Sequence, residues 1–160
     1  MINEDIKIIE FYLPKSDCKK ITKFVYQEKD KWKKDLKNVK SLTSGFNPDY
    51  KFLHDIGDYC CKEILPKNIG FDNWVKTYWW MNFYEKGQYA ARHHHNPELY
   101  SMIMIIKPSI NNCLNFKIQD ENRLVQDKEG LSLIFPSTIE HWVDPVESDR
   151  ISIAMDFRSF

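Results

Sequence analysis

The sequence predicts an α+β protein that is mainly β, with a helical first part followed by a jelly-roll-like set of antiparallel strands. Two observations carry this prediction. Before about residue 70, apolar residues recur at helical spacing, whereas the later chain holds short runs rich in aromatic and β-branched residues. Gly, Pro, Asn and Asp separate these runs, as is typical of a sandwich or barrel.

The length of 160 residues indicates one domain spanning residues 1–160. We expect residues 1–70 to form a helical support and residues 71–160 to form the β core. Lys plus Arg and Asp plus Glu both number 23, so net charge gives no attraction to nucleic acid or to a membrane. The longest apolar run, residues 102–106, has the length of a strand rather than of a membrane span.

The cysteine pattern and the N-terminal segment predict a cytoplasmic location. The four cysteines show no C-x-x-C spacing, and a chain of this length needs no disulfide scaffold, so reduced thiols are expected. The first residues, "MINEDIKIIEFYLP", lack the basic start and long apolar run of a signal peptide.

In the first part, residues 6–13 predict a short strand. A first helix is predicted over residues 15–39, with Ser16 as its N-cap. A second helix is predicted over residues 50–68 and is expected to stop at Pro66.

One basic stretch stands out in the first predicted helix. Residues 29–40 contain six lysines and two aspartates around Trp32. Such a stretch can contact nucleic acid or an acidic partner. We interpret it as a solvated helix face, so nucleic acid is not favoured as a partner.

The β core is predicted from eight runs along the later chain. They cover residues 74–84, 89–95, 99–107, 113–119, 123–127, 131–136, 139–145 and 150–157.

The second of these runs contains three consecutive histidines. Side chains alternate along a strand, so His93 and His95 are expected on one face and His94 on the other. His141 lies far enough along the chain to return beside them as a third ligand, whereas His54, in a predicted helix, is a poor candidate. Three neutral imidazoles suit Fe(II), Zn(II), Cu, Ni or Mn, and ligand type alone does not select among these metals.

The last run begins with an arginine and a serine on one strand face. Arg150 offers a planar fork for a carboxylate, and Ser152 adds a hydroxyl group. Near a metal, this pair could hold the far carboxylate of a chelating 2-oxo acid. The alternative is a surface arginine that pairs with Glu147 or Asp149.

These residues together resemble the 2-oxoglutarate/Fe(II)-dependent dioxygenases, and within them the prolyl-hydroxylase-like branch of bacteria and phages. The likeness spans about residues 74–158. The segments that carry it are "WMN" (80–82) with Gly87, "RHHHNP", Ser101, "CLNF" (113–116) and the final stretch from "GLSLIFP" to "MDF". The resemblance implies a double-stranded β-helix with N-terminal helices packed on one side.

The same resemblance implies the site residues and the reaction. His93, His95 and His141 would be the iron ligands, and Arg150 with Ser152 would hold the 2-oxoglutarate carboxylate. The implied activity couples oxidative decarboxylation of 2-oxoglutarate to hydroxylation of a C–H bond, in a prolyl or other peptide side chain or in a small molecule. Ascorbate is an additional reductant that the resemblance allows. The sequence does not indicate an oligomeric state.

Two departures from the family pattern concern the second ligand and the co-substrate pocket. Most such oxygenases place aspartate where this chain has His95. Many prolyl hydroxylases also hold 2-oxoglutarate with a tyrosine on the strand after the ligands, and the corresponding segment here, "SMIMIIK" (101–107), contains no tyrosine. Asn82, Tyr84 or Tyr78 could replace it, and Tyr84 is favoured.

Two other classes remain open from the sequence. The cupins share this barrel, and Gly87, five residues and then the His93–His95 pair approach their first motif. In that interpretation Glu98 would be a fourth ligand beside His141. The third class is a metal-free barrel that only binds a partner.

Overall fold

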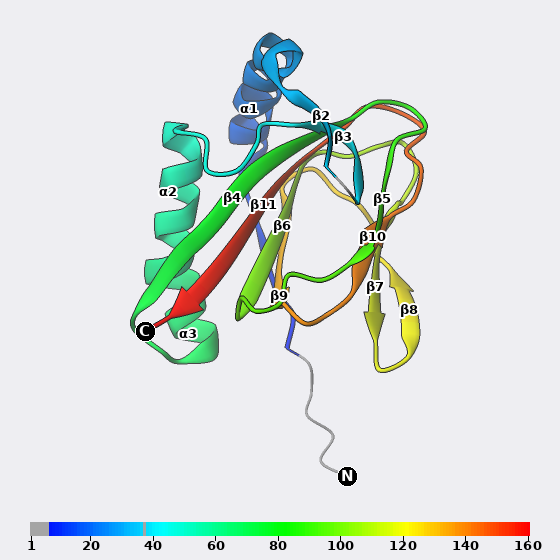
Figure 1. Cartoon of the computed structure of the whole chain (residues 1–160). Helices are drawn as coiled ribbons and strands as arrows, with labels where there is room; N and C mark the ends of the chain where they lie inside the picture. Colours follow the sequence, from blue (N-terminus) through cyan, green and yellow to red (C-terminus); the bar gives the residue numbers. More distant parts are fainter. Residues whose placement is uncertain (1–6, 37) are drawn as a thin grey trace.

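The computed structural model describes residues 7–36 and 38–160, and Figure 1 shows its elements in chain order. Its helices are α1 (Lys15–Glu28), α2 (Lys51–Tyr59) and α3 (Leu65–Ile69). Its strands are β1 (Ile9–Tyr12), β2 (Lys33–Leu36), β3 (Val39–Thr43), β4 (Trp74–Tyr84), β5 (Tyr89–His93), β6 (Tyr100–Lys107), β7 (Leu114–Ile118), β8 (Glu121–Leu124), β9 (Leu131–Pro136), β10 (His141–Val143) and β11 (Arg150–Ser159). No helix in the described ranges is long and apolar enough to cross a bilayer.

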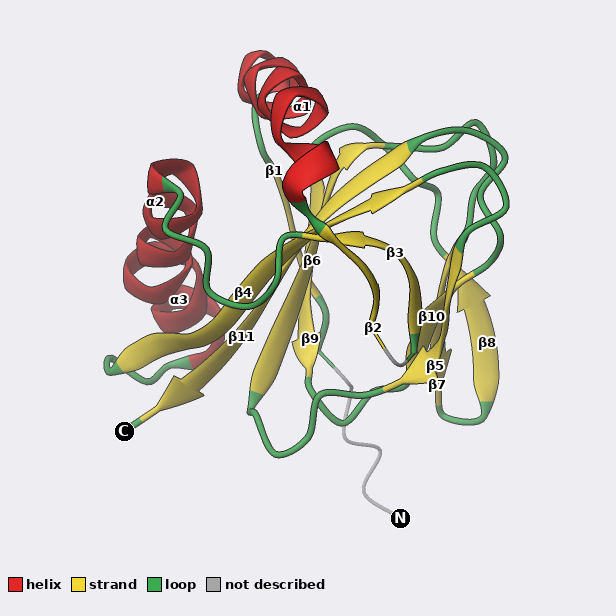
Figure 2. Ribbon diagram, turned by 45° about the horizontal axis from the view of Figure 1, so that its top comes forward, coloured by secondary structure: helices red, strands yellow, loops and turns green. Residues whose placement is uncertain are grey.

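The strands form one antiparallel sheet that curls over on itself. Their order is β1-β9-β6-β11-β4-β3-β5-β10-β7-β8, and β2 pairs with β3 at the side. Figure 2 shows the strands β1, β9, β6, β11 and β4 as one wall and β5, β10, β7 and β8 as the facing wall. β3 joins the two walls because it pairs with both β4 and β5. The predicted α+β class and double-stranded β-helix are confirmed.

Alternation along β11 separates two cores. Ile151, Ile153 and Met155 face the helices, whereas Arg150 and Ser152 face the barrel interior, where they lie opposite Tyr84 and Asn82 of β4.

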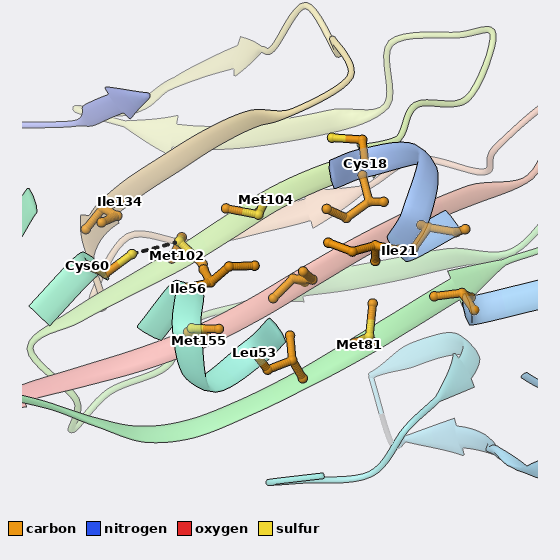
Figure 3. Packing of buried hydrophobic residues seen from close by; sticks show 14 of the residues in the cluster. Cys18, Ile21, Leu53, Ile56, Cys60, Met81, Met102, Met104, Ile134 and Met155 are labelled. Atoms are coloured by element: carbon orange, nitrogen blue, oxygen red, sulfur yellow. Dashed lines mark hydrogen bonds between the residues drawn. The ribbon is translucent and has the colours of Figure 1, made fainter. Parts of the chain in front are cut away.

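The helix-side core packs α1 and α2 against the wall that contains β4, β6 and β11. Figure 3 shows Leu53 and Ile56 of α2 on either side of Met155, with Met81 and Ile21 of α1 farther to the right. The helices therefore cover one side of the barrel, as predicted.

Three strands from the first 70 residues belong to the sheet. β1 pairs with β9, and the β2–β3 hairpin joins β4 to β5. Residues 1–70 are thus not a purely helical support, in contrast to the expected division at residue 70. Ile6, part of the first predicted strand, lies outside the described residues.

The prediction of a first helix over residues 15–39 is wrong beyond Glu28. A 3-10 turn (Lys29–Lys31) follows α1, and the chain then forms the β2–β3 hairpin. Val39 pairs with Ala90 of β5, so tertiary pairing decides the structure of a segment whose apolar spacing suits a helix. The basic stretch therefore lies on this turn and hairpin rather than on a helix face, and its Lys37 lies outside the described residues.

Both predicted helix boundaries also need correction. α1 begins at Lys15, and its N-cap is Pro14, whose carbonyl accepts from the N–H groups of Asp17 and Cys18, so Ser16 is not the cap. Pro66 does not stop the second helix. It lies in the first turn of α3, after a π-helical turn (Cys60–Ile64) that widens the helix where proline lacks an N–H group.

A glycine just before β9 ties β1 to the sheet. The carbonyl of Gly130 accepts from the N–H group of Leu13, and its own N–H group donates to Ile105. Its φ of +85° is left-handed, and a Cβ at this position would overlap the backbone oxygen of Leu13.

We expect Gly130→Ala to lower the free energy of unfolding by more than the roughly 1–3 kcal/mol that a left-handed non-glycine residue costs. Backbone overlap adds to conformational strain at this residue. Gly45→Ala is the matched control, because Gly45 has a φ of +77° but no atom within 4 Å of the added Cβ. Denaturant unfolding measures both variants, and equal losses would contradict the expectation.

Candidate metal centre

Three histidines converge at one end of the barrel interior. His93, the last residue of β5, lies directly opposite His141, the first residue of β10. Their ring centroids are 4.3 Å apart, and the His95 ring lies 4.9 Å from that of His141. One potential ligand atom from each residue lies within 4.8 Å of the others. Three imidazoles at this spacing can hold a single metal ion.

His95 reaches this cluster by a route that strand alternation did not foresee. β5 ends at His93, so His95 lies in the turn that follows rather than on the strand. Its backbone N–H group donates to the carbonyl of Ser137, and its Nδ1 lies 2.7 Å from Oδ1 of Asp156. The predicted partition of the three histidines nevertheless agrees with the structure, because His94 is exposed and stays outside the cluster.

Hydrogen bonds orient all three rings in the same way. Nδ1 of His93 lies 2.6 Å from the carbonyl oxygen of Ala91, and Nδ1 of His141 lies 3.1 Å from that of Ile139. Because these acceptors and the Asp156 carboxylate require N–H donors, each Nδ1 carries the proton. Each Nε2 is then left with a free lone pair that can bind a metal. The three histidines therefore fit the metal ion that the resemblance in the sequence implies.

Burial favours the neutral form of His141 and of His93. His141 is 2% exposed and lies beside the rings of Phe116 and Phe135, at centroid distances of 5.9 and 5.1 Å. Desolvation holds the pKa of His141 well below its ordinary value of 6.5 and, with the neighbouring imidazole of His95, also lowers the pKa of His93. Neutral imidazole is the form that binds metal.

The low pKa of His141 predicts a pH dependence of the metal-free protein. Below about pH 6.5 the unfolded chain binds a proton at this residue that the folded chain does not bind, so stability falls as the pH falls toward the folded-state pKa. We expect the melting temperature of chelator-treated protein to fall less between about pH 7.5 and 5.5 in His141→Gln than in the wild type. Parallel curves for the two proteins would contradict this expectation.

Glu98 is not a fourth ligand, which removes the cupin-type ligand set. Its carboxylate accepts from Nε and Nη2 of Arg158 at 2.9 and 2.8 Å and from Oγ1 of Thr77 at 2.7 Å. The residue is 6% exposed, and it does not belong to the histidine cluster. His54 is also elsewhere, since it contacts Asp49 at the surface.

Arg150 is buried in the barrel rather than exposed at the surface. It is 1% exposed, and its Nε and Nη2 have no hydrogen-bond partner. Its Nε lies 3.7 Å from Oδ2 of Asp127, an ion pair whose two side chains are each 1% exposed. The alternative partners Glu147 and Asp149 are therefore wrong. A buried guanidinium with unused donors fits a carboxylate that enters the barrel.

Three of the other predicted co-substrate residues lie at neighbouring positions of β11 and β4. The guanidinium carbon of Arg150 lies 5.5 Å from the centroid of the Tyr84 ring. Burial raises the pKa of Tyr84 to about 12, so its phenol remains a donor at neutral pH. Ser152 is 4% exposed and pairs in register with Asn82, whose Oδ1 is buried without a partner. Tyr78, the remaining alternative, is 45% exposed at the cleft instead.

A cleft of about 600 Å³ opens beside the histidines. Aromatic side chains line one side of it, because Phe46 contacts Tyr78 and Trp80 at centroid distances of 5.7 and 5.2 Å. Trp80 also lies 5.4 Å from the ring of His95. Trp80 therefore contacts both the aromatic lining of the cleft and the histidine cluster.

Sequence reasoning missed three residues of this region. Asp156 was not considered, although it lies six residues after Arg150 and therefore on the same face of β11. Asp127 was not considered as a site residue, and its place at the end of the predicted run 123–127 is wrong, because β8 ends at Leu124 and Asp127 lies in the loop before β9. Phe46 lies between β3 and α2, outside every element that was predicted from the sequence.

Comparison with solved structures identifies the fold. A prolyl-4-hydroxylase from Pseudomonas putida superposes with a TM-score of 0.78 at 12% identity, covering 98% of this chain and 94% of that one. A viral collagen prolyl hydroxylase from Paramecium bursaria chlorella virus 1, in complex with 2-oxoglutarate, gives 0.76 at 13% identity and covers all of both chains.

A prolyl hydroxylase from Trichoplax adhaerens, in complex with a peptide fragment of the hypoxia-inducible factor oxygen degradation domain, gives 0.78 at 14% identity, covering 98% and 84%. No model of a known protein family and no curated protein matches the sequence. The chain has the fold of these oxygenases, as the resemblance in its motifs implied.

Proposed function

We propose that this protein is an Fe(II)- and 2-oxoglutarate-dependent dioxygenase that hydroxylates a C–H bond, with His93, His95 and His141 as iron ligands. The observation that carries the proposal is Arg150, which is buried in the barrel that holds the histidines and whose Nε and Nη2 have no hydrogen-bond partner. Structural histidine–metal sites have no need of such an arginine. A co-substrate that presents a second carboxylate accounts for it.

The proposed roles follow from the contacts of each residue. The three imidazoles present Nε2 atoms because their Nδ1 atoms are already used. Arg150 and Ser152 would bind the far carboxylate of 2-oxoglutarate, while the Tyr84 phenol and the Asn82 amide would complete the walls of its pocket. When bound, iron and 2-oxoglutarate together supply the activation of oxygen and the oxidation of the substrate.

The chain itself orients the reactants and limits water. Phe116 and Phe135 close the side of the barrel behind His141. The aromatic cleft lies beside His93 and His95, and a substrate carbon could approach the metal from it. Orientation of this kind lowers the entropy cost of bringing reacting groups together.

A peptide side chain, with proline as the first candidate, is the proposed substrate, and a small molecule is the alternative. The support is the size and aromatic lining of the cleft, together with the peptide bound by the similar Trichoplax protein. The four cysteines of the chain are free thiols, in keeping with the proposed cytoplasmic location.

The proposal is tested by turnover. Protein supplied with Fe(II), 2-oxoglutarate, oxygen and a set of proline-containing peptides should form succinate, and one peptide should gain one oxygen atom by mass spectrometry. Ascorbate in parallel reactions tests its expected role as an additional reductant. The proposal would be contradicted if iron-loaded protein formed no succinate with any peptide or small molecule tested and also none in the absence of substrate.

A further inference from the structure

We propose that Asp156 is a positioning residue that supplies the metal centre, through His95, with the negative charge that a carboxylate ligand would otherwise bring. This inference rests on the metal site of the proposed function. In most of these oxygenases an aspartate binds the metal at the position of His95. Here the carboxylate would be retained, but it would contact the histidine ligand instead of the metal.

The contact between the two residues is short and buried. Oδ1 of Asp156 lies 2.7 Å from Nδ1 of His95, and the side chains are 7% and 10% exposed. A carboxylate can only accept, so the imidazole donates and its Nε2 points its lone pair away from Asp156. A charged acceptor makes this hydrogen bond stronger than one to a neutral oxygen.

The other two histidines lack such a charge. The Nδ1 atoms of His93 and His141 face the backbone carbonyl oxygens of Ala91 and Ile139, which are neutral acceptors. Within the described residues, His95 is thus the one member of the cluster whose outer nitrogen contacts a carboxylate. The carboxylate of Asp156 thus contacts His95, the residue found where most of these oxygenases have aspartate.

The surroundings hold Asp156 in this orientation. Oγ of Ser101, a fully buried residue, donates to the same Oδ1 at 2.7 Å. Since that hydroxyl proton is used, Oγ of Ser137 donates in turn to Oγ of Ser101 at 2.8 Å. The carboxylate therefore accepts from a serine and a histidine at once, and neither bond depends on an exposed side chain.

Local backbone structure contributes to the same placement. The register between β11 and β4 shifts between Asp156 and Phe157, so that Thr77 of β4 has no partner opposite it. Its Oγ1 lies 3.2 Å from the backbone oxygen of Asp156 and donates to Glu98. Such bulges re-aim a side chain next to a functional site.

Outer carboxylates of this kind fix the ring of a metal-bound histidine and raise its basicity. Their loss typically weakens metal binding by about 10–100-fold. Asp156 is expected to act in this way on His95 without touching the metal.

The first test measures metal affinity instead of turnover. Co(II) is titrated into purified apo protein and followed by its visible absorption. Asp156→Asn keeps the shape of the side chain but removes its charge, and should weaken Co(II) binding by about 10–100-fold. Glu98→Gln removes another buried carboxylate, one that contacts Arg158 and Thr77, and should leave the affinity unchanged.

The second test exchanges the position of the charge. His95→Asp alone brings two carboxylates next to each other and should bind Co(II) more weakly than the wild type, because like charges oppose each other. His95→Asp combined with Asp156→Asn returns the site to one carboxylate, and the asparagine amide can donate to it. The double variant should therefore bind more tightly than His95→Asp.

Two results would overturn the inference. One is a folded Asp156→Asn protein with wild-type Co(II) affinity. The other is a His95→Asp single variant that binds Co(II) at least as tightly as the double variant. Neither measurement uses 2-oxoglutarate or oxygen. The role of Asp156 in metal binding is therefore tested even if the protein binds metal but has no oxygenase activity. Circular dichroism and melting temperatures verify that each variant is folded.

Discussion

Replacing His141 by alanine is expected to abolish tight metal binding. His141 is the most buried of the three histidines, and no other histidine, cysteine or carboxylate in the described residues lies within the cluster to take its place. The loss in Co(II) or Fe(II) affinity should exceed the roughly 10–100-fold effect of losing an outer partner such as Asp156. Equilibrium titration of the apo protein measures it.

The adjacent histidine provides the control for this experiment. His94 is exposed, and its Nδ1 accepts from the N–H group of Asn96, two residues further along the chain. His94→Ala removes an imidazole from the same three-residue run and should leave metal affinity unchanged. If His94→Ala and His141→Ala lost affinity equally, the metal would lie elsewhere than in the proposed cluster.

Replacing Arg150 is expected to have the second large effect, on 2-oxoglutarate. Charge-assisted hydrogen bonds contribute about 1.5–3 kcal/mol each, so losing two should weaken 2-oxoglutarate binding by at least about 100-fold. Arg150→Met alone also leaves Asp127 buried without its cation, at a cost of roughly 3–5 kcal/mol in stability. Loss of binding by this variant could therefore come from unfolding.

A double variant separates the two causes. Arg150→Met with Asp127→Asn removes both charges of the buried pair, and it should recover most of the stability lost by Arg150→Met. It should bind metal normally but still fail to bind 2-oxoglutarate in calorimetric titrations of Mn(II)-loaded protein. Wild-type 2-oxoglutarate affinity in the double variant would exclude Arg150 as the carboxylate-binding residue.

The strands of the barrel could be predicted because their signal is local. The run "WVKTYWWMNFY" coincides with β4, and "LSLIFP" coincides with β9. The β2–β3 hairpin could not be predicted in this way. Its strands exist because Val39 and Leu42 pair with β5 and β4, and such long-range pairing leaves no periodic pattern in the hairpin itself.

Part of the candidate site could be predicted because side-chain alternation along a strand is also a local signal. The two-residue period of β11 correctly placed Arg150 and Ser152 on one face, and following it for four more residues would have reached Asp156. The convergence of His93 with His95 was predicted from the alternation of side chains along one strand. That argument does not apply to His95, because β5 ends at His93. Asp127 was predicted at the end of a strand but lies in a loop beyond Leu124, where strand alternation gives no direction for its side chain.

The central claim is that one barrel binds a metal and 2-oxoglutarate together, and an anaerobic titration tests it most directly. Fe(II) is added to the apo protein and then 2-oxoglutarate, and visible absorption is followed. We predict a charge-transfer band that requires both additions and is absent from the folded Arg150→Met, Asp127→Asn variant. Fe(II) binding in the wild type with no band and no measurable 2-oxoglutarate binding would contradict the claim.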